Sequence, residues 1–248
     1  MEFKLEICTD NIQSAIDAQE AGANRIELCD NLIEGGTTPG HGAISTARSK
    51  LGPGLHVIIR PRGGDFLYSN LEYEIMKKDI GFCRSCGVDG IVTGILKSDG
   101  SIDTERTREL AGLAWPMSVT FHRAFDMCRD PVKSLEDVIA TGARRLLTSG
   151  QEDNAANGAA LIRKLVELSG KRIIIMPGSG LTESNIEAVA RLTGAMEFHL
   201  TGRKTIESGM SFRKEGIKMG GKAGISEFRR KVVDVEVIKR IIKILEHI

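Results

Sequence analysis

Polar motifs follow six apolar runs of this 248-residue chain, and each motif precedes a helix-like segment. The motifs occupy residues 5–8, 26–29, 59–65, 121–126, 148–150 and 177–180. In a parallel β/α barrel the loops that follow the strands converge on one face, so motifs in these positions share a pocket. Six such motifs therefore predict a barrel with a single site at the carboxyl ends of its strands.

The spacing of the apolar runs supports the same architecture. Eight runs rich in Val, Ile and Leu begin near residues 3, 25, 55, 90, 117, 144, 172 and 196. Their spacing centres on roughly 30 residues, the size of one βα unit. We predict a single (β/α)8 TIM-type barrel domain over residues 1–248, with an irregular last unit. An open doubly wound sheet is the alternative, but no glycine-rich dinucleotide fingerprint follows the first run.

The last unit differs from the others in composition. Residues 203–233 are rich in Lys, Arg, Gly and Ser and lack periodicity, so we expect a long loop after the eighth strand. Residues 234–248 carry apolar side chains at helical spacing and are expected to form the last barrel helix. Because so long a loop can reach a neighbouring copy, we also expect a homo-oligomer.

The overall charge and the start of the chain limit which partners and which cellular compartment we expect. A net charge of +1 gives no bulk electrostatic basis for binding nucleic acid. No apolar stretch approaches the ~20 residues of a membrane span, and the acidic start does not resemble a secretory signal. Five cysteines in a chain of this size suggest reduced thiols. We therefore expect a cytoplasmic protein with no membrane partner.

Five charged residues at or near strand ends form a candidate catalytic group: Glu6, Glu27, Arg60, His122 and Asp126. Charged side chains are rarely buried unless they are paired, and charges at the carboxyl ends of barrel strands usually serve chemistry. Carboxylates, a histidine and an arginine suit acid/base catalysis on a bound anion. Salt-bridge packing inside the barrel is the alternative interpretation.

Candidate anion-binding residues surround that group. The guanidinium of Arg62, like that of Arg60, has the planar fork that binds carboxylate or phosphate. Gly178, Ser179 and Gly180 follow the seventh run, and Thr201 and Gly202 follow the eighth. These are the usual phosphate-binding positions of a β/α barrel. Glycines that merely form tight turns would give the same pattern, so both readings stay open.

Two cysteines end parallel motifs, Leu-Glu-Ile-Cys8 and Ile-Glu-Leu-Cys29. Adjacent parallel strands lie ~4.8 Å apart, so these two side chains can approach each other, and two thiolates suit a soft ion such as Cu(I). Inert packing is the alternative, because free cysteine behaves as a small hydrophobe. Cys83 and Cys86 form a CxxC pair at a helix end, where the helix dipole opposes thiolate formation, so we read them as structural.

Several long motifs resemble the CutC family of copper-homeostasis proteins. They are Ile59-Arg60-Pro61-Arg62-Gly63-Gly64-Asp65-Phe66, Val119-Thr120-Phe121-His122-Arg123-Ala124-Phe125-Asp126-Met127, Leu147-Thr148-Ser149-Gly150, Glu34-Gly35-Gly36-Thr37-Thr38-Pro39 and Glu207-Ser208-Gly209-Met210. The resemblance implies a single-domain β/α barrel, copper handling in the cytoplasm, and copper at Cys8 and Cys29.

The sequence therefore leaves two functional hypotheses. One is a copper-homeostasis protein that binds Cu(I) through Cys8 and Cys29. The other is a β/α-barrel enzyme that acts on a small anionic, phosphorylated compound. The fold hosts so many chemistries that it does not decide between them.

Overall fold

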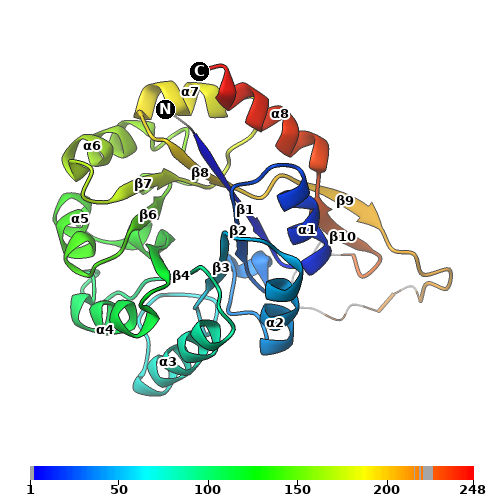
Figure 1. Cartoon of the computed structure of the whole chain (residues 1–248), viewed down its shortest axis with the longest axis horizontal. Coiled ribbons are helices and arrows are strands. Elements are labelled where there is room, and N and C mark those ends of the chain that lie inside the picture. The colour runs from blue at the N-terminus through cyan, green and yellow to red at the C-terminus, as the bar shows by residue number, and fades with distance from the viewer. Residues whose placement is uncertain (1–2, 215, 218, 220–225) are drawn as a thin grey trace.

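The computed structural model describes residues 3–214, 216–217, 219 and 226–248, and it confirms a β/α barrel (Figure 1). Its eight parallel strands begin close to the eight apolar runs of the sequence. They are β1 (Lys4–Thr9), β2 (Arg25–Leu28), β3 (Leu55–Ile58), β4 (Gly90–Thr93), β5 (Ser118–Phe121), β6 (Arg145–Thr148), β7 (Ile174–Pro177) and β8 (Glu197–Leu200).

The strand order shows how the sheet curls into a barrel. Strands β1 to β7 neighbour one another in sequence order, and β8 pairs with β1 on its other side. A parallel bridge between Gly178 and His199 joins the end of β7 to β8. The two edges of the sheet therefore meet, which excludes the open doubly wound alternative.

Helices surround the barrel and cover the apolar outer surface of the sheet (Figure 1). They are α1 (Ile12–Glu20), α2 (His41–Lys50), α3 (Asn70–Ser85), α4 (Thr104–Ala114), α5 (Pro131–Ala140), α6 (Ala159–Ser169), α7 (Ile186–Thr193) and α8 (Val235–Glu246), with short 3-10 turns η1 (Leu32–Glu34) and η2 (Arg123–Met127). Side-chain caps fix several helix starts; Ser69 and Glu72, for example, form a reciprocal capping box at α3. No helix in the described ranges is long and apolar enough to cross a membrane.

Charged side chains fill part of the barrel interior. Glu197 lies between two arginines, with its Oε2 2.7 Å from Arg25 Nη2 and 2.7 Å from Arg145 Nε. Arg25 also binds Glu6 through its Nε. All four side chains are buried. Because a buried charge is costly unless it is paired, this network makes a charged barrel interior tolerable.

The segment after β8 differs from the expected loop. Residues 203–207 and 229–233 form two antiparallel strands, β9 (Arg203–Glu207) and β10 (Arg229–Val233), where Arg203 pairs with Val233. The two-stranded arm projects from the side of the barrel beside α1 (Figure 1). Residues 215, 218 and 220–225 of the expected loop lie outside the described residues. The sequence did not reveal these strands, since their side chains are mostly polar and exposed.

Candidate functional site

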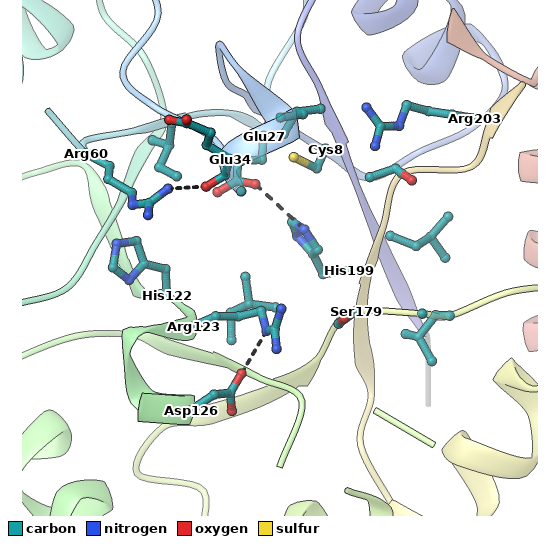
Figure 2. A pocket seen from close by; sticks show the side chains of 18 of the residues that line it. Cys8, Glu27, Glu34, Arg60, His122, Arg123, Asp126, Ser179, His199 and Arg203 are labelled. Atoms are coloured by element: carbon teal, nitrogen blue, oxygen red, sulfur yellow. Dashed lines mark hydrogen bonds and ion pairs between the residues drawn. The ribbon is translucent and has the colours of Figure 1, made fainter. Parts of the chain in front are cut away.

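A cavity of about 650 Å³ opens at the carboxyl ends of the barrel strands (Figure 2). Charged, thiol and apolar side chains share its wall. The lining residues are Cys8, Glu27, Leu32, Glu34, Gly35, Ile58, Arg60, Phe66, His122, Arg123, Asp126, Met127, Leu147, Ser179, Gly180, Leu181, Thr182, His199, Leu200, Thr201 and Arg203. Five of the six polar motifs contribute residues to this wall, whereas the motif at residues 148–150 does not.

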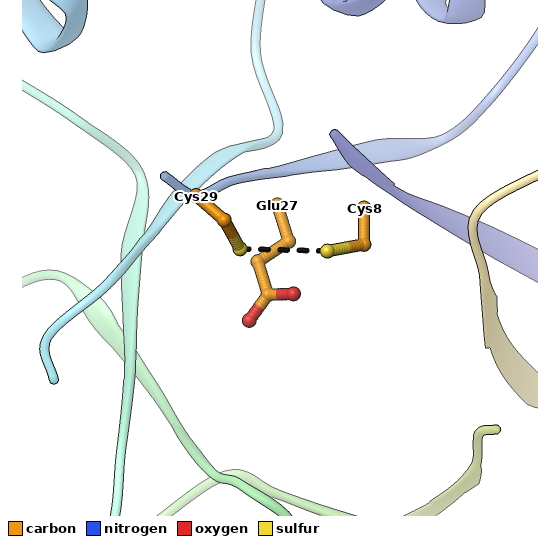
Figure 3. A group of neighbouring side chains, drawn as sticks. All are labelled: Cys8, Glu27 and Cys29. Carbon is orange, nitrogen blue, oxygen red and sulfur yellow. Dashed lines mark hydrogen bonds between the residues drawn. The ribbon is translucent and has the colours of Figure 1, made fainter. Parts of the chain in front are cut away.

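Cys8 lines this cavity, and its side chain meets that of Cys29, which does not itself line the cavity. Their sulfur atoms lie 3.4 Å apart, and both residues are buried (Figure 3). Cys8 is the direct register partner of Glu27, and Cys29 follows β2 immediately, so the two thiols converge from adjacent strands. One ligand atom from each of Cys8, Glu27 and Cys29 lies within 4.8 Å of the others. The cluster could hold a soft metal ion, with the carboxylate as an additional oxygen donor.

The electrostatics of this cluster distinguish its two thiols. The hydrogen bond from Cys29 lowers the pKa of Cys8 to about 5, so Cys8 is a thiolate at neutral pH. Burial raises the pKa of Cys29 well above its ordinary value, and the Cys8 charge raises it further. Burial and that same charge raise the pKa of Glu27. The cluster therefore favours a thiolate at Cys8 and the protonated forms of Cys29 and Glu27.

His199 links the cluster to the barrel interior. Its Nε2 lies 3.7 Å from Glu27 Oε2, and its Nδ1 lies 2.7 Å from Glu6 Oε1. Burial alone would lower the pKa of His199, but its hydrogen bonds with Cys8 and Glu6 raise it well above the ordinary value. His199 therefore lies between the Cys8 sulfur and the buried Glu6 carboxylate, and both favour its protonated form. This histidine is not among the candidate site residues that the sequence suggested.

Glu6 does not line the cavity, contrary to the expectation that it shares a pocket with the other catalytic candidates. It is fully buried below the cavity floor, where it binds Arg25 and His199. Burial would raise the pKa of Glu6, but Arg25 and His199 together lower it below the ordinary range. Glu6 is thus a buried counter-ion of Arg25.

Arg60 lines the cavity but is held by the surrounding loops. Its Nη1 donates to the carbonyl oxygens of Glu34 and Gly36 at 2.7 and 2.8 Å, and its Nη2 donates to that of Gly64 at 2.8 Å. The guanidinium also stacks over the ring of Phe66. Backbone oxygens accept hydrogen bonds from both terminal nitrogens, so Arg60 links two loops. Because these nitrogens are already engaged, Arg60 is poorly placed to bind an anion.

His122 lines the same wall as a neutral imidazole. Its Nδ1 accepts a hydrogen bond from the Ala124 N–H, which places the proton on Nε2. Burial and nearby Arg60 lower the pKa of His122 to about 3. A Cβ on Gly94 would lie 2.7 Å from Nδ1, so glycine at that position lets the ring pack against the chain after β4.

Asp126 is saturated by hydrogen bonds from the chain after β6. Its carboxylate accepts from the Thr148 hydroxyl at 2.5 Å, from both the N–H and the hydroxyl of Ser149, and from the Gln151 N–H at 3.2 Å. It also binds Arg123 Nε at 2.8 Å. Asp126 therefore positions Arg123, a residue that sequence reasoning did not select although it lies within a selected motif.

The anion-binding candidates divide into two groups. Ser179, Gly180 and Thr201 line the cavity, while Gly178 and Gly202 do not. Arg62 also lies outside, because its guanidinium binds Asp65 and Glu72 in its own loop and at the start of α3. The motif alone could not show these partners of Arg62. The five catalytic candidates thus do not form one acid/base group.

The CxxC pair contributes nothing to the cavity. Cys83 is fully buried in α3, and burial raises the pKa of its thiol to about 12. Cys86 ends the same helix. Both are distant in the fold from the strand ends that line the cavity, as expected for structural cysteines.

Fold and site together define a β/α-barrel protein with a buried thiol pair at the mouth of its barrel. The model of the CutC family matches residues 3–204, so the chain belongs to the CutC family. A CutC family protein from Chromobacterium violaceum is 50% identical over 246 residues, covering 99% of both chains. The human copper homeostasis protein cutC homolog is 44% identical, covering 99% of this chain and 90% of its own length.

Solved structures agree with this assignment. The crystal structure of CutC from Streptococcus agalactiae has a TM-score of 0.76 and 36% identity, and the match covers 80% of this chain and 98% of that one. Thiamine phosphate pyrophosphorylase from Pyrococcus furiosus has a TM-score of 0.60 at 15% identity, covering 99% of this chain and 96% of that one. The second similarity concerns the barrel fold alone.

Proposed function

We propose that this member of the copper-homeostasis family binds Cu(I) directly, through Cys8 and Cys29. The observation that carries the proposal is the 3.4 Å separation of the two sulfur atoms, one of which belongs to Cys8 on the cavity wall. Thiolates are the ligands that Cu(I) prefers among protein side chains. A cavity that opens to solvent gives the ion a route to them.

The protonation states of the cluster favour uptake of a soft cation. Cys8 already carries a negative charge, so only the Cys29 proton must leave when both sulfurs bind. Metal–sulfur bonds of about 2.3 Å, the value for zinc, place two sulfurs on one ion roughly 4 Å apart or more. The side chains must therefore separate slightly from 3.4 Å, a shift that a χ1 adjustment at either cysteine supplies.

Competition with a coloured Cu(I) chelator under anaerobic, reducing conditions tests this proposal. We expect the wild type to take one Cu(I) per chain from the chelator, and the Cys8→Ser/Cys29→Ser variant to take far less. A Cys83→Ala/Cys86→Ala variant is the matched control, since it also removes two thiols but none from the cavity. Equal Cu(I) withdrawal by the wild type and the Cys8/Cys29 variant would refute the assignment.

We also propose that the protein works in the cytoplasm as a homo-oligomer. All five cysteines are free thiols, including the 3.4 Å pair, as suits a reducing compartment. Exposed apolar side chains on the arm, among them Met210 and Phe212, support association between copies.

A further inference from the structure

The cavity is far larger than a copper ion needs. A volume of about 650 Å³ falls within the range of sites for small organic molecules, about 300–1,000 Å³. Apolar side chains make up much of its wall: Leu32, Ile58, Phe66, Leu147, Leu181 and Leu200. These apolar side chains provide no ligand atom for a bare ion. They suit the carbon skeleton of an organic ligand.

Arg123 is a charged group on this wall that hydrogen bonds position and that is also partly exposed. Its Nε lies 2.8 Å from Asp126 Oδ2, and its Nη2 lies 2.8 Å from Ser149 Oγ and 3.4 Å from the Glu152 carbonyl oxygen. These contacts hold one edge of the guanidinium. The side chain nevertheless remains 41% exposed, so the other edge is accessible from the cavity, toward which Figure 2 shows it pointing.

Asp126 holds Arg123 in place and is itself fixed by several donors. Its carboxylate accepts hydrogen bonds from Thr148, Ser149 and Gln151. This arrangement fixes the orientation of the guanidinium in advance, and a fixed guanidinium loses little conformational freedom when it binds an anion.

The segment beside Arg123 is equally rigid. Ser179 has a φ of 80°, an unusual backbone conformation for a residue with a side chain. Its hydroxyl donates to the Asp153 carbonyl oxygen at 2.8 Å, and its own carbonyl oxygen accepts from the Ala155 N–H at 3.0 Å. Strained backbone held by such contacts concentrates at ligand sites, which makes Ser179 a second indication of a ligand here.

The other charged groups on the wall do not oppose an anion at Arg123. Arg203 adds a positive charge on another part of the wall, with Asp10 3.9 Å from its Nη1. Glu34 lies across the cavity and receives a hydrogen bond from Asn31. Glu27, also across the cavity, lies 3.7 Å from His199 Nε2 through its Oε2.

We propose that the cavity binds a small organic anion, whose phosphate or carboxylate group contacts Arg123 and whose apolar body packs toward Leu181 and Leu200. The site uses neither cysteine and is independent of the proposed Cu(I) binding. The arginine of this site is Arg123, which the structure places at the cavity, and not Arg62, which the sequence suggested.

Calorimetric titration of the metal-free protein with phenyl phosphate and with benzoate tests this proposal. The two probes share an apolar ring and differ in the anionic group, so they distinguish the two ligand chemistries. Phenol, with the same ring and no charge, controls for apolar binding. We expect at least one anion to bind at millimolar concentration or below, and phenol to bind at least about tenfold more weakly, as loss of a charged hydrogen bond implies.

Two variants locate the site. Arg123→Gln should weaken binding of the anion about tenfold or more, because it removes the charge that the ligand contacts. Arg62→Gln is the matched control and should leave the affinity unchanged, since that guanidinium binds only its own loop and the start of α3. The proposal is overturned if neither anion binds the wild type, if phenol binds as well as the anions, or if the Arg62 variant loses affinity and the Arg123 variant keeps it.

Discussion

His199 Nδ1 lies 2.7 Å from Glu6 Oε1, and this contact joins the site to the barrel interior. Glu6 in turn binds Arg25, which shares Glu197 with Arg145. A continuous chain of buried charges therefore runs from the middle of the barrel to the thiol pair. The protonation of the thiol pair depends on this chain, so the interior charges are part of the site as well as of the fold.

Removing the central acid of this chain should destabilise the protein strongly. Glu197→Gln leaves Arg25 and Arg145 buried without their shared carboxylate, and breaking a buried pair in this way costs about 3 kcal/mol or more. Urea unfolding measures the loss. The control Glu136→Gln breaks an exposed ion pair with Arg172 and should cost less than about 1 kcal/mol. Similar losses in both variants would contradict the role assigned to the interior network.

Cys8 should react as a thiolate well below the pH at which ordinary thiols ionise. With a pKa of about 5, its alkylation rate should level off above pH 6, whereas a free thiol keeps gaining rate up to about pH 8.5. Peptide mass spectrometry after iodoacetamide treatment follows each cysteine separately. Cys29→Ala removes the hydrogen bond that lowers this pKa, so it should shift the profile upward.

Cys83 provides the internal control for that experiment. Its buried thiol should stay unmodified throughout the same pH series, because burial raises its pKa to about 12. A Cys8 profile that keeps rising to pH 8.5, or one that Cys29→Ala leaves in place, would show that Cys29 does not stabilise a Cys8 thiolate.

Acid should destabilise the protein through His122. Its pKa is about 3 in the folded chain and 6.5 ordinarily, so between these values the unfolded chain binds the extra proton. Stability therefore falls as pH decreases from 6.5 toward 3, by up to about 1.4 kcal/mol per pH unit from this residue. His56, with a pKa of about 4, adds to the same trend.

Unfolding curves of His122→Asn between pH 7 and 4 test this contribution. Asparagine can still accept the Ala124 N–H but does not titrate, so the pH dependence should become shallower than in the wild type. An unaltered slope in His122→Asn would mean that this histidine does not bind its proton preferentially in the unfolded chain.

The arm formed by β9 and β10 should contribute to association between copies. Phe212 is 71% exposed and lies just beyond β9, together with exposed Met210. Light scattering should give a mass above the 27.0 kDa of one chain, and Phe212→Ser should lower it. A wild-type mass near 27.0 kDa over a concentration series would reject the expected homo-oligomer.

The barrel could be predicted from the sequence because its strands are buried on both faces. Apolar runs such as those at β3 and β6 recur at a spacing that centres on roughly 30 residues, and this pattern can be read without knowledge of contacts. The arm was missed for the opposite reason. Its strands pair only with each other and remain largely exposed, so β9 and β10 carry Lys and Arg in place of an apolar pattern.

The site was predicted less completely, since ion-pair partners depend on geometry across the barrel. The sequence placed Cys8 and Cys29 on adjacent strands, and their sulfurs do meet. The sequence could not show that Glu6 pairs with Arg25, because these two residues are far apart in the chain. It also could not show that Asp126 orients Arg123, because Asp126 is held by hydrogen bonds from the next loop. The sequence likewise could not show that Arg62 lies outside the cavity, since tertiary contacts set the direction of its loop.

X-ray absorption at the copper edge tests direct Cu(I) binding by the thiol pair most directly. The protein loaded with one equivalent of Cu(I) should show two sulfur neighbours at short distance, and the spectrum should be unchanged in Cys83→Ala/Cys86→Ala. In Cys8→Ser/Cys29→Ser the sulfur neighbours should disappear. A wild-type spectrum with only nitrogen and oxygen neighbours, or one whose sulfur signal survives loss of both Cys8 and Cys29, would contradict the account.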